Sequence, residues 1–581
     1  MSLLNNISGP QDLKKIELNK LEELCAEIRS FFIDQLLVNG GHFSANLGVV
    51  ELTVALHYVF DLPIDKLIWD VGHQSYIHKL LTGRKAEFNT IRKWKGLSGF
   101  PNLKESEYDA FGTGHSSTSI SAALGMAEAD RLDDNNHHHI AVIGDGSLSG
   151  GMAFEALNNL GCSTANVLVV VNDNEMGIDP NLGAVNQHLE YIEGSKENLF
   201  ENLNLEYEGP VDGHDVVALV HLFERQRELS HPRVVHIKTL KGKGYSPAEE
   251  EQTKWHSVKY VKLPAIKPET LEVKPLKLQE VFGKTLLQMA LKDDRIVGVT
   301  PAMPSGSSMN ILMDVLPQRV FDVGIAEQHA VTFAAGLALK GKRPFCHLYS
   351  SFAQRAYDQI IHDVALQKIP VIFCLDRAGL VGEDGPTHHG MFDLASLQSI
   401  PNLSIIAPRD EWELRNAMAW AVQHLEGPVV LRYPKGRGFH VDWENEINLR
   451  DFKGAEEINS GKEICIISIG TTADEARKAI DFAQLSNKVR HIDLRFIKPL
   501  DMEMLQEVFE NSEHILCIED GIEQGGVGMT LSSLASDLDY KGSFKRFSVT
   551  NEFSPHGTVE ELKEFHGLDA KSIAAYLVNL Q

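Results

Sequence analysis

The sequence predicts an α/β protein of three domains, each built on a mostly parallel sheet. Short apolar runs of strand length alternate with stretches whose apolar residues repeat at helical spacing, which is typical of parallel strands covered by helices on both faces. The chain has 581 residues, too many for a single hydrophobic core. Polar stretches at 248–277 and 442–462 interrupt the alternation. We therefore expect domains over residues 1–265, 275–440 and 455–581.

The elements follow in a regular order. Residues 12–38 place Leu21, Leu24, Ile28 and Phe32 on one face of a helix. The strand-length runs that come after are apolar throughout rather than alternating, which predicts strands buried on both faces. The predicted strands are 139–143, 166–171, 234–239, 295–300, 371–375, 429–432, 464–469 and 514–518.

Composition limits the partners and the compartment. The formal net charge of -25 argues against nucleic acid or an anionic membrane as a partner. The N-terminus shows no basic stretch followed by an apolar one, and no apolar run reaches the length of a bilayer span, so we expect a cytoplasmic protein. The six cysteines have no metal-ligand or redox spacing, which predicts reduced and mostly buried thiols.

Two of the predicted strands end in polar turns that the fold brings together. Strand 139–143 is followed by a Gly-Asp-Gly turn that contains Asp145, and strand 166–171 is followed by Asn-Asp-Asn, which ends at Asn174. A helix is expected between the two strands. Because parallel strands joined by a helix end at the same sheet edge, Asp145 and Asn174 should lie close together although they are 29 positions apart.

The residue types at this edge suit a magnesium ion and a diphosphate. The carboxylate of Asp145, the amide oxygen of Asn174 and the backbone carbonyl of Met176 are hard oxygen ligands. Backbone N–H groups at Gly146 and Ser147 begin a helix and can approach phosphate oxygens. A Gly-Asp-Gly turn alone is weak evidence, because such turns are common after strands. Its combination with Asn-Asp-Asn at this distance favours a cofactor site.

Seven longer motifs carry a resemblance that covers nearly the whole chain. With the Gly-Asp-Gly to Asn spacing, they make the sequence similar to thiamine-diphosphate enzymes of the transketolase superfamily, and in particular to the 1-deoxy-D-xylulose-5-phosphate synthase family. The motifs are Gly40-Gly-His-Phe-Ser, Trp69-Asp-Val-Gly-His-Gln-Ser-Tyr, Gly114-His-Ser-Ser-Thr-Ser, Gly209-Pro-Val-Asp-Gly-His-Asp, Asp322-Val-Gly-Ile-Ala-Glu-Gln-His-Ala, Tyr349-Ser-Ser-Phe-Ala-Gln-Arg-Ala-Tyr-Asp-Gln and Asp376-Arg-Ala-Gly-Leu-Val-Gly-Glu-Asp-Gly-Pro-Thr-His.

The resemblance implies a fold, two cofactors and a reaction. The fold is transketolase-like: the first domain binds the diphosphate and Mg²⁺, the second binds the pyrimidine of thiamine diphosphate, and a smaller third domain ends the chain. The enzyme works as a homodimer. It is a transferase that decarboxylates pyruvate and joins the remaining fragment to D-glyceraldehyde 3-phosphate. The product, 1-deoxy-D-xylulose 5-phosphate, feeds non-mevalonate isoprenoid, thiamine and pyridoxal phosphate synthesis.

The resemblance also assigns cofactor residues. Glu327 follows a predicted strand and opens an apolar helix; it is implied to hydrogen-bond the pyrimidine ring and so activate the cofactor. Read alone, it would be a glutamate stabilised by the helix dipole. Phe352 is implied to stack on the pyrimidine, the alternative being a core aromatic. The remaining implied cofactor residues are His73, Gly114, His115 and Ser116.

A phosphorylated aldehyde requires cations in an acidic chain. Arg377 comes directly after strand 371–375 and Asp376, and its planar guanidinium suits a phosphate. Tyr349 supplies a hydroxyl donor. Lys435 stands in Arg-Tyr-Pro-Lys-Gly where the family usually has a second arginine, so the charge is kept but the bidentate geometry is lost. Each of these residues alone would be read as part of a surface ion pair, and the two cations with the hydroxyl of Tyr349 together predict a phosphate clamp.

Proton transfers call for groups that titrate near neutral pH, and histidine is the natural choice. The candidates lie in the family motifs, whereas a histidine chosen at random among the 25 in the chain is expected to be structural. The catalytic candidates are His42, His73, His256, His388, Asp384, which orients hydroxyl groups, and Arg355.

The chain departs from the family between Leu189 and Gly209, where a much longer segment is usual. We expect the shorter segment to leave the site more open, to alter a closure triggered by pyruvate, or to mark a paralogue with a relaxed choice of acceptor. Two alternatives within the superfamily are a transketolase, which releases no carbon dioxide, and a 2-oxo-acid dehydrogenase component, which needs a lipoyl partner. A third is an idle paralogue that serves as a binding subunit. Such a paralogue should have lost Glu327, Asp145 or Asn174, and all three are present.

Overall fold

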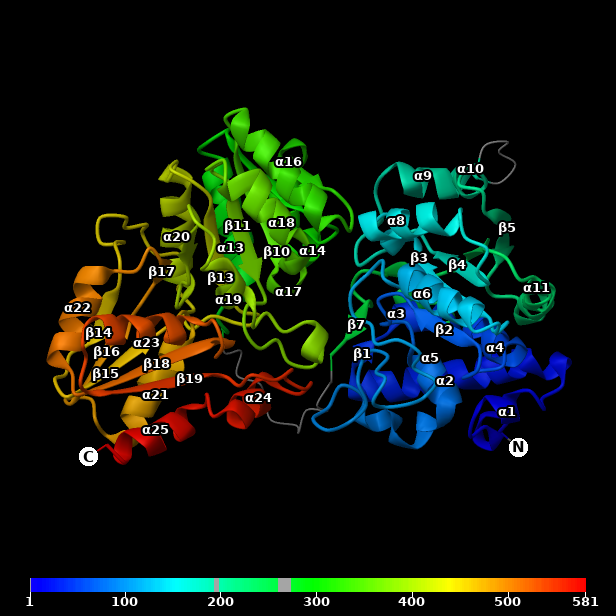
Figure 1. Ribbon diagram of the computed structural model, residues 1–581, viewed down its shortest axis with the longest axis horizontal. Helices are drawn as coiled ribbons and strands as arrows, with labels where there is room; N and C mark the ends of the chain where they lie inside the picture. The colour runs from blue at the N-terminus through cyan, green and yellow to red at the C-terminus, as the bar shows by residue number, and fades with distance from the viewer. Residues whose placement is uncertain (1, 193–197, 260–272, 581) are drawn as a thin grey trace. The chain divides into compact units, whose positions relative to one another are not determined.

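The structure of the protein is a computed structural model that describes residues 2–192, 198–259 and 273–580 (Figure 1). Its residues form two compact units. The first comprises Met1–Lys267 with Gly324–Ala326, and the second comprises Pro268–Val323 and Glu327–Gln581. The predicted boundary stretch 248–277 falls partly on residues 260–272, which lie outside the described part of the chain. The limits of the three domains therefore stay a prediction.

The first unit is built on a five-stranded parallel sheet with the strand order β2-β3-β4-β6-β5. Three of the predicted strands are present as β3, β4 and β6, and their ends differ from the prediction by one or two residues. Their side chains are almost all buried, which explains why the sequence shows no polar alternation there. The strands are β2 (Lys66–Trp69), β3 (His139–Gly144), β4 (Val167–Asp173), β5 (Glu206–Asp212) and β6 (Arg233–Lys238).

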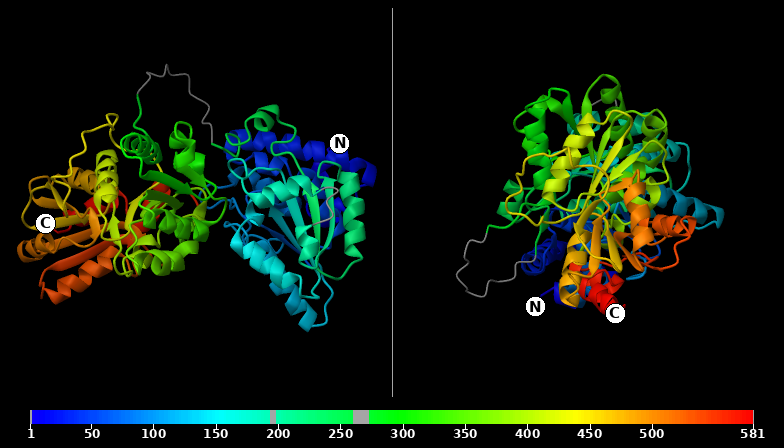
Figure 2. Two further views of the ribbon diagram at one scale, coloured as in Figure 1. Left: turned by 90° about the horizontal axis from the view of Figure 1, so that it is seen from above. Right: turned by 90° about the vertical axis from the view of Figure 1, so that its left-hand side faces the viewer.

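Helices cover both faces of this sheet (Figure 2). One core packs α2, α4 and α11 against strand residues such as Val142 and Val170. The other packs α6 and α8 against Ala141 and Val169, as the two-residue period of a strand requires. The helical segments of this unit are η1 (Leu4–Asn6), α1 (Pro10–Leu13), η2 (Leu18–Lys20), α2 (Leu21–Asn39), α3 (Ser44–Leu47), α4 (Val50–Val59), α5 (Tyr76–Lys79), η3 (Leu80–Arg84), η4 (Lys85–Thr90), α6 (Ser119–Leu132), α7 (Asp145–Leu148), α8 (Gly151–Leu160), α9 (Ala184–Tyr191), α10 (Leu199–Asn202), α11 (Val216–Arg227) and α12 (Ser246–Glu250).

Two predictions about this unit need correction or comment. The first long helix begins at Leu21 rather than at residue 12, and short helical turns precede it. The shortened segment between Leu189 and Gly209 holds the end of α9, the single turn α10 and the start of β5. Residues 193–197 within it lie outside the described part of the chain.

The second unit contains a seven-stranded sheet with the order β17-β12-β13-β11-β10-β8-β9. All neighbours are parallel except β17, which is antiparallel to β12. Strand β17 comes from the C-terminal part of the chain, so it ties that part to this sheet. The strands are β8 (Ile296–Thr300), β9 (Val320–Asp322), β10 (Arg343–Tyr349), β11 (Ile372–Asp376), β12 (Ser404–Ile406), β13 (Val429–Tyr433) and β17 (Phe496–Lys498).

A further five-stranded sheet of the second unit has the order β14-β16-β15-β18-β19. Only β14 is antiparallel to its neighbour. The strands predicted at 464–469 and 514–518 are its β15 and β18. The strands are β14 (Glu456–Asn459), β15 (Ile464–Ser468), β16 (Val489–Asp493), β18 (His514–Ile522) and β19 (Ser543–Val549).

Helices separate and cover the two sheets of the second unit. Helices α13 and α20 pack on one face of the seven-stranded sheet, and α16 packs on the other in a core that continues to the five-stranded sheet with α22 and α23. Helices α21 and α25 cover the remaining face. The helical segments are α13 (Leu278–Ala290), α14 (Pro304–Ser307), α15 (Asn310–Met313), η5 (Pro317–Arg319), α16 (Glu327–Leu339), α17 (Ser350–Ala353), η6 (Gln354–Ala356), α18 (Tyr357–Gln359), η7 (Ile360–Ala365), η8 (Gly385–Thr387), α19 (Asp393–Leu397), α20 (Glu411–Gln423), α21 (Thr472–Ala483), α22 (Met502–Asn511), α23 (Val527–Asp537), α24 (Val559–His566) and α25 (Ala570–Val578).

The predicted fold class is confirmed: the protein is α/β with three mostly parallel sheets. A short antiparallel pair adds β1 (Gly41–His42) and β7 (Ser257–Val258). All six cysteines are free thiols, and five of them are buried, as expected. Among the described residues, none of the helices combines the length and the apolar character that a bilayer crossing requires.

Candidate active site

Asp145 and Asn174 lie at one edge of the first sheet, as predicted. Strands β3 and β4 are neighbours with Gly144 opposite Asn172, so Asp145 and Asn174 follow at the carboxyl ends of both. Asp145 is buried, and its Oδ2 has no hydrogen-bond partner. Burial and the neighbouring charge of Asp173 raise the pKa of Asp145 to about 7. A buried carboxylate oxygen without a donor is a position that a cation would satisfy.

The rest of the predicted metal ligands form a turn after β4. The Oδ1 of Asn174 accepts a hydrogen bond of 3.1 Å from the N–H of Met176, which keeps the amide side chain over the backbone of that residue. Asp173 lies between them and the sheet, and its carboxylate contacts Nε2 of His236 at 2.9 Å. Burial opposes ionisation of Asp173, but the bond to His236 outweighs it and lowers the pKa. The turn therefore offers the neutral oxygens of Asn174 and Met176 next to the carboxylate of Asp173.

Lys241 is a site residue that the sequence analysis did not select. It follows β6, its side chain is buried, and its Nζ donates a hydrogen bond to the carbonyl of Gly177. Burial lowers the pKa of Lys241 to about 8, against the opposing charges of Asp145 and Asp179. No motif marks this lysine; its only signal is a position at the carboxyl end of a predicted strand. It adds a cation to the edge where a diphosphate is expected.

The loop that contains Gly114, His115 and Ser116 is fixed by a buried aspartate. Asp70 follows β2, and its carboxylate accepts hydrogen bonds from the N–H of Ser117 at 2.7 Å and from the N–H and Oγ of Ser119 at 3.0 and 2.8 Å. The Oγ of Ser117 donates to the carbonyl of Ser147 at 2.7 Å. The loop is thereby joined to the Asp145 turn, which brings the predicted residues Ser116 and Ser147 into one neighbourhood.

A side chain at Gly146 in the same turn would require Asn181 to move. A Cβ at this position would lie 2.9 Å from Oδ1 of Asn181, inside normal contact distance. The predicted reason for a glycine, close approach of the backbone to a ligand, is consistent with this crowding.

Three of the predicted histidines cluster. The ring centroid of His42 lies 5.7 Å from that of His73 and 5.8 Å from that of His256, and the last two are 5.4 Å apart. The pairing of β1 with β7 brings His42 opposite Ser257. The Nδ2 of Asn46 donates to the carbonyls of both His42 and His73, at 3.0 and 2.8 Å. The first unit therefore collects three groups that can carry protons.

In the second unit, Glu327 is the first residue of α16 and is buried. Burial raises its pKa, and the charge of Arg355 only partly opposes this. The raised pKa shifts the carboxyl group toward its protonated form, the form that can donate a hydrogen bond to a ring nitrogen. The prediction that Glu327 opens a helix after a strand is confirmed.

Aromatic rings connect the other candidates of this unit. The rings of Tyr349 and Phe352 stack with centroids 5.5 Å apart, and His388 meets Phe352 edge-on at 5.4 Å. The guanidinium of Arg377 lies over the ring of Tyr349 at 4.1 Å. Arg377 also forms an ion pair with the buried Asp376 at the end of β11. The structure thus joins Phe352, His388, Tyr349 and Arg377 in one group.

Lys435 and Asp384 contact each other at the other side of the same loop. The Nζ of Lys435 lies 3.2 Å from the carbonyl of Val381, 3.5 Å from Glu383 and 4.0 Å from the carboxylate of Asp384. Lys435 is exposed, unlike Arg377. The second cation of the predicted clamp therefore lies near the loop, bound to acidic neighbours rather than stacked on Tyr349.

The candidate residues form two sets. The first unit holds oxygen ligands, a buried lysine and three histidines, which fit a metal-bound diphosphate. The second unit holds a buried carboxyl group and a separate group of stacked aromatic rings, which suit a pyrimidine, and cations that suit a phosphate ester. The first set thus offers oxygen and nitrogen groups suited to a metal ion and a diphosphate, and the second offers a carboxyl group and cations suited to a ring nitrogen and a phosphate ester.

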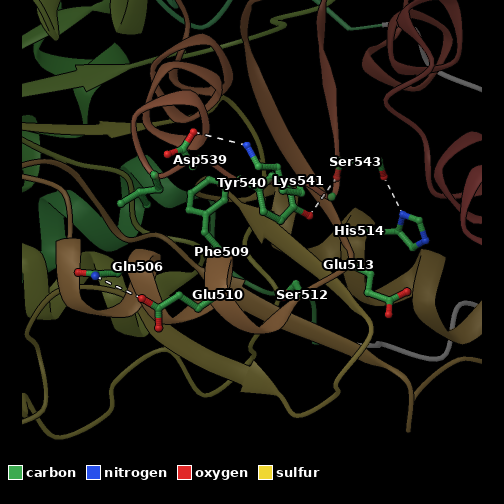
Figure 3. Close-up of a pocket in the computed structure, with 12 residues that line it drawn as sticks. Gln506, Phe509, Glu510, Ser512, Glu513, His514, Asp539, Tyr540, Lys541 and Ser543 are labelled. Atoms are coloured by element: carbon green, nitrogen blue, oxygen red, sulfur yellow. Dashed lines mark hydrogen bonds and ion pairs between the residues drawn. The ribbon is translucent and has the colours of Figure 1, made fainter.

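A hollow in the C-terminal part of the second unit lies apart from these residues (Figure 3). It opens where β18 and β19 begin, between His514 and Ser543, whose side chains contact at 2.7 Å. Ligands of parallel α/β sheets bind at the carboxyl ends of the strands, and this hollow is at the amino ends. It contains none of the predicted site residues.

Three family models match the sequence. The model described as 1-deoxy-D-xylulose-5-phosphate synthase matches residues 4–197 and 191–239, the transketolase pyrimidine binding domain matches 274–438, and the transketolase C-terminal domain matches 453–573. The fold and the residue sets, together with these matches, define the class: the protein is an α/β enzyme of the transketolase type.

Curated relatives identify the family. The proteins called 1-deoxy-D-xylulose-5-phosphate synthase from Bacteroides thetaiotaomicron, Parabacteroides distasonis and Thermomicrobium roseum are 47%, 46% and 44% identical to this chain. The matches cover 99%, 99% and 98% of this chain and 96%, 98% and 96% of the relatives. The chain therefore belongs to the 1-deoxy-D-xylulose-5-phosphate synthase family, and membership of this family implies dependence on thiamine diphosphate.

Among solved structures, the transketolase from Campylobacter jejuni matches 97% of this chain and 100% of its own, at 18% identity and a TM-score of 0.45. That similarity is too low to carry an argument. The family assignment depends on the sequence relatives alone.

Proposed function

We propose that this enzyme condenses pyruvate with D-glyceraldehyde 3-phosphate to give 1-deoxy-D-xylulose 5-phosphate and carbon dioxide, using thiamine diphosphate and Mg²⁺. The observation that carries the proposal is Glu327, a buried carboxyl group with a raised pKa at the start of α16. An idle paralogue has no use for such a group, because burying a carboxyl group costs stability. The product would feed isoprenoid, thiamine and pyridoxal phosphate synthesis.

The two residue sets serve the two ends of one cofactor. Thiamine diphosphate, when bound, supplies a carbon nucleophile and an electron sink for decarboxylation. Glu327 hydrogen-bonds the pyrimidine and holds the proton that sets its tautomer. Phe352 offers its ring for stacking, and His73, Gly114, His115 and Ser116 form the surroundings of the diphosphate.

The metal is assigned to the edge of the first sheet. Asp145, Asn174 and the carbonyl of Met176 supply oxygen ligands, and Lys241 with the N–H groups of Gly146 and Ser147 neutralises phosphate charge. The unpartnered Oδ2 of Asp145 supports this assignment. The cation removes the repulsion between Asp145 and Asp173 that burial otherwise intensifies.

The substrates are assigned to cations and proton carriers. Arg377 and Tyr349 bind the phosphate of the aldehyde, and Lys435 adds charge from the other side of the loop. Asp384 orients hydroxyl groups, and His388 moves a proton to or from the aldehyde oxygen. His42, His73 and His256 exchange protons near the reacting carbon, and Arg355 is a further catalytic candidate.

The assembly and the domain plan complete the proposal. We expect a homodimer in the cytoplasm, with a diphosphate domain over 1–265, a pyrimidine domain over 275–440 and a C-terminal domain over 455–581. Residues 274–438 and 453–573 match separate family models, which supports the last two limits. Sedimentation of the purified enzyme would test the dimer.

One assay tests the activity. The purified protein is incubated with thiamine diphosphate, Mg²⁺, pyruvate and D-glyceraldehyde 3-phosphate, and the sugar phosphate and carbon dioxide are measured, with Glu327→Ala as control. Both products from the wild type, and neither from the variant, would support the proposal. Carbon dioxide without the sugar phosphate would indicate another acceptor, and no turnover despite bound cofactor would contradict the proposal.

A further inference from the structure

The acceptor loop, residues Arg377–Met391, rests on a short segment from the C-terminal part of the chain. That segment is Ser554–Gly557 and is called the support segment below. A Cβ added at Gly385 would lie 3.0 Å from Cβ of His556, and one added at Gly382 would lie 3.3 Å from the carbonyl oxygen of Gly557. Both glycines have positive φ, of 72° and 100°. The loop is therefore packed against the support segment with no room for side chains at these positions.

His389 is the polar link between the acceptor loop and the support segment. Its ring is 2% exposed. Nδ1 accepts a hydrogen bond of 3.1 Å from the N–H of Val381, and Nε2 lies 3.0 Å from the carbonyl of Pro555. Because an N–H only donates and a carbonyl only accepts, the ring must be neutral with its proton on Nε2. Burial lowers the pKa of His389, in agreement with this form.

The support segment is itself held in place. The Oγ of Ser554 contacts Nε2 of His566 at 2.8 Å, and Nδ1 of the same ring contacts Oγ1 of Thr550 at 2.8 Å. At the end of the acceptor loop, the N–H of Ile522 donates to the carbonyl of Met391 at 2.9 Å. The loop that carries Asp384 and His388 thus lies against a fixed surface, and His389 joins it to that surface.

We propose that His389 is a positioning residue, which fixes the acceptor loop so that Asp384 and His388 meet the phosphorylated aldehyde in the correct geometry. It acts through these two residues and does not touch the substrate. The inference rests on the proposed function, since that function assigns Asp384 and His388 to the acceptor. A displacement of about 1 Å in groups that orient a substrate is costly, which gives a buried link of this kind a kinetic consequence.

The test compares two substitutions in the enzyme loaded with thiamine diphosphate and Mg²⁺. His389→Ala removes both hydrogen bonds, whereas His389→Gln keeps an amide oxygen for Val381 and an N–H for Pro555. For the alanine variant we expect the KM for D-glyceraldehyde 3-phosphate to rise about tenfold, which corresponds to about 1.4 kcal/mol. The KM for pyruvate and the cofactor affinity should stay within about twofold, because neither partner of His389, Val381 or Pro555, is assigned to pyruvate or to the cofactor. The glutamine variant should recover most of the acceptor affinity.

Hydrogen exchange gives a readout that does not depend on turnover. Peptides covering 378–392 should exchange faster in His389→Ala than in the wild type, and His389→Gln should restore protection. His566→Leu, which loosens the support segment from the other side, should shift exchange and KM in the same direction. His514→Ala is the matched control, because it breaks a histidine–serine contact at the hollow of Figure 3; it should change neither quantity.

An unchanged acceptor KM with unchanged exchange in His389→Ala would overturn the inference. Equal defects in the alanine and glutamine variants would do the same. A loss of pyruvate, cofactor and acceptor binding together would indicate general destabilisation and would also overturn it. If the wild type makes no 1-deoxy-D-xylulose 5-phosphate, the proposed function fails instead, and the exchange data still decide whether His389 holds the loop.

Discussion

Two buried carboxyl groups, Asp145 in the first unit and Glu327 in the second, have raised pKa values for different reasons. Both follow a parallel strand and begin a helix. Asp145 is surrounded by charge: burial and Asp173 raise its pKa to about 7, and Lys241 lies close enough to feel its charge. Burial raises the pKa of Glu327, and a hydrogen bond from the backbone and the charge of Arg355 oppose the shift.

The difference teaches that a raised pKa alone does not define a role. A cation offsets the repulsion between two neighbouring carboxylates, so Asp145 fits the role of a metal ligand. A buried carboxyl group without a second carboxylate nearby avoids the cost of a buried charge by keeping its proton, so Glu327 fits the role of a hydrogen-bond donor. The predictions below test whether Asp145 acts as a metal ligand and Glu327 as a hydrogen-bond donor.

The largest effect is expected for Glu327→Ala. Loss of the protonated carboxyl removes the group that sets the tautomer of the pyrimidine, and turnover should fall by about 10³-fold, within the usual range for a positioned acid or base. Cofactor binding, followed by quenching of intrinsic fluorescence, should change little. Retention of more than a tenth of the activity would contradict the role given to Glu327.

Much of the fold could be predicted from the sequence. Strands buried on both faces of a parallel sheet are continuous apolar runs, which can be identified without knowing the strands beside them. β3, β4 and β6 were located to within two residues. The first helix was set too early, since Ile16 and Leu18 fit the helical spacing and yet precede α2. Apolar spacing reports burial, whereas the start of a helix depends on local backbone geometry.

The site was predicted unevenly. Asp145 and Asn174 follow neighbouring parallel strands of the first sheet, so their proximity at its edge follows from topology, whereas Glu327 follows a strand of the second unit and begins α16. Lys241 and His389 were missed, because their importance lies in contacts with residues far away in the sequence, Gly177 and Pro555. Such contacts depend on how loops pack, and no local pattern encodes them.

The effect of Asp145→Asn on thermal stability should reverse when the metal binds. Without Mg²⁺, the variant lacks the repulsion with Asp173, so at pH 8 its Tm should exceed that of the wild type. With Mg²⁺ and thiamine diphosphate the order should invert, and the affinity for the cofactor should fall about 100-fold. Calorimetric titration and thermal scans, with and without EDTA, measure both. A variant that is less stable under both conditions would remove the distinction between the two carboxyls.

Arg377→Ala should raise the KM for D-glyceraldehyde 3-phosphate by about 30-fold, as expected for the loss of a charged hydrogen bond of about 2 kcal/mol. The KM for pyruvate should stay close to that of the wild type. Arg377→Lys keeps the charge but loses the planar guanidinium over Tyr349. Its KM for D-glyceraldehyde 3-phosphate should therefore lie between those of the wild type and Arg377→Ala. Equal effects on both substrates would place Arg377 outside the acceptor site.

The pH dependence of stability should respond to Glu327→Gln. Because the folded state raises the pKa of Glu327 above its ordinary value of 4.5, the folded state holds the proton more tightly than the unfolded state does. Stability from this group is complete below pH 4.5 and is lost as the pH rises through the raised value. The cofactor-free wild type should therefore lose more Tm than Glu327→Gln between pH 5 and pH 8. Parallel curves would show that the carboxyl is already ionised in the folded protein.

The smallest effect is expected for Lys435→Arg, which restores the residue usual in the family. The lysine is exposed and bound to Val381, Glu383 and Asp384, so part of its charge is already neutralised. A guanidinium can hold those acceptors and still direct a second N–H toward a phosphate, which should lower the KM for D-glyceraldehyde 3-phosphate by about twofold to threefold. Lys435→Gln, which removes the charge, should raise it by a similar factor. If arginine weakened binding instead, the acidic contacts of Lys435 would be its main role, and the phosphate would depend on Arg377 and Tyr349 alone.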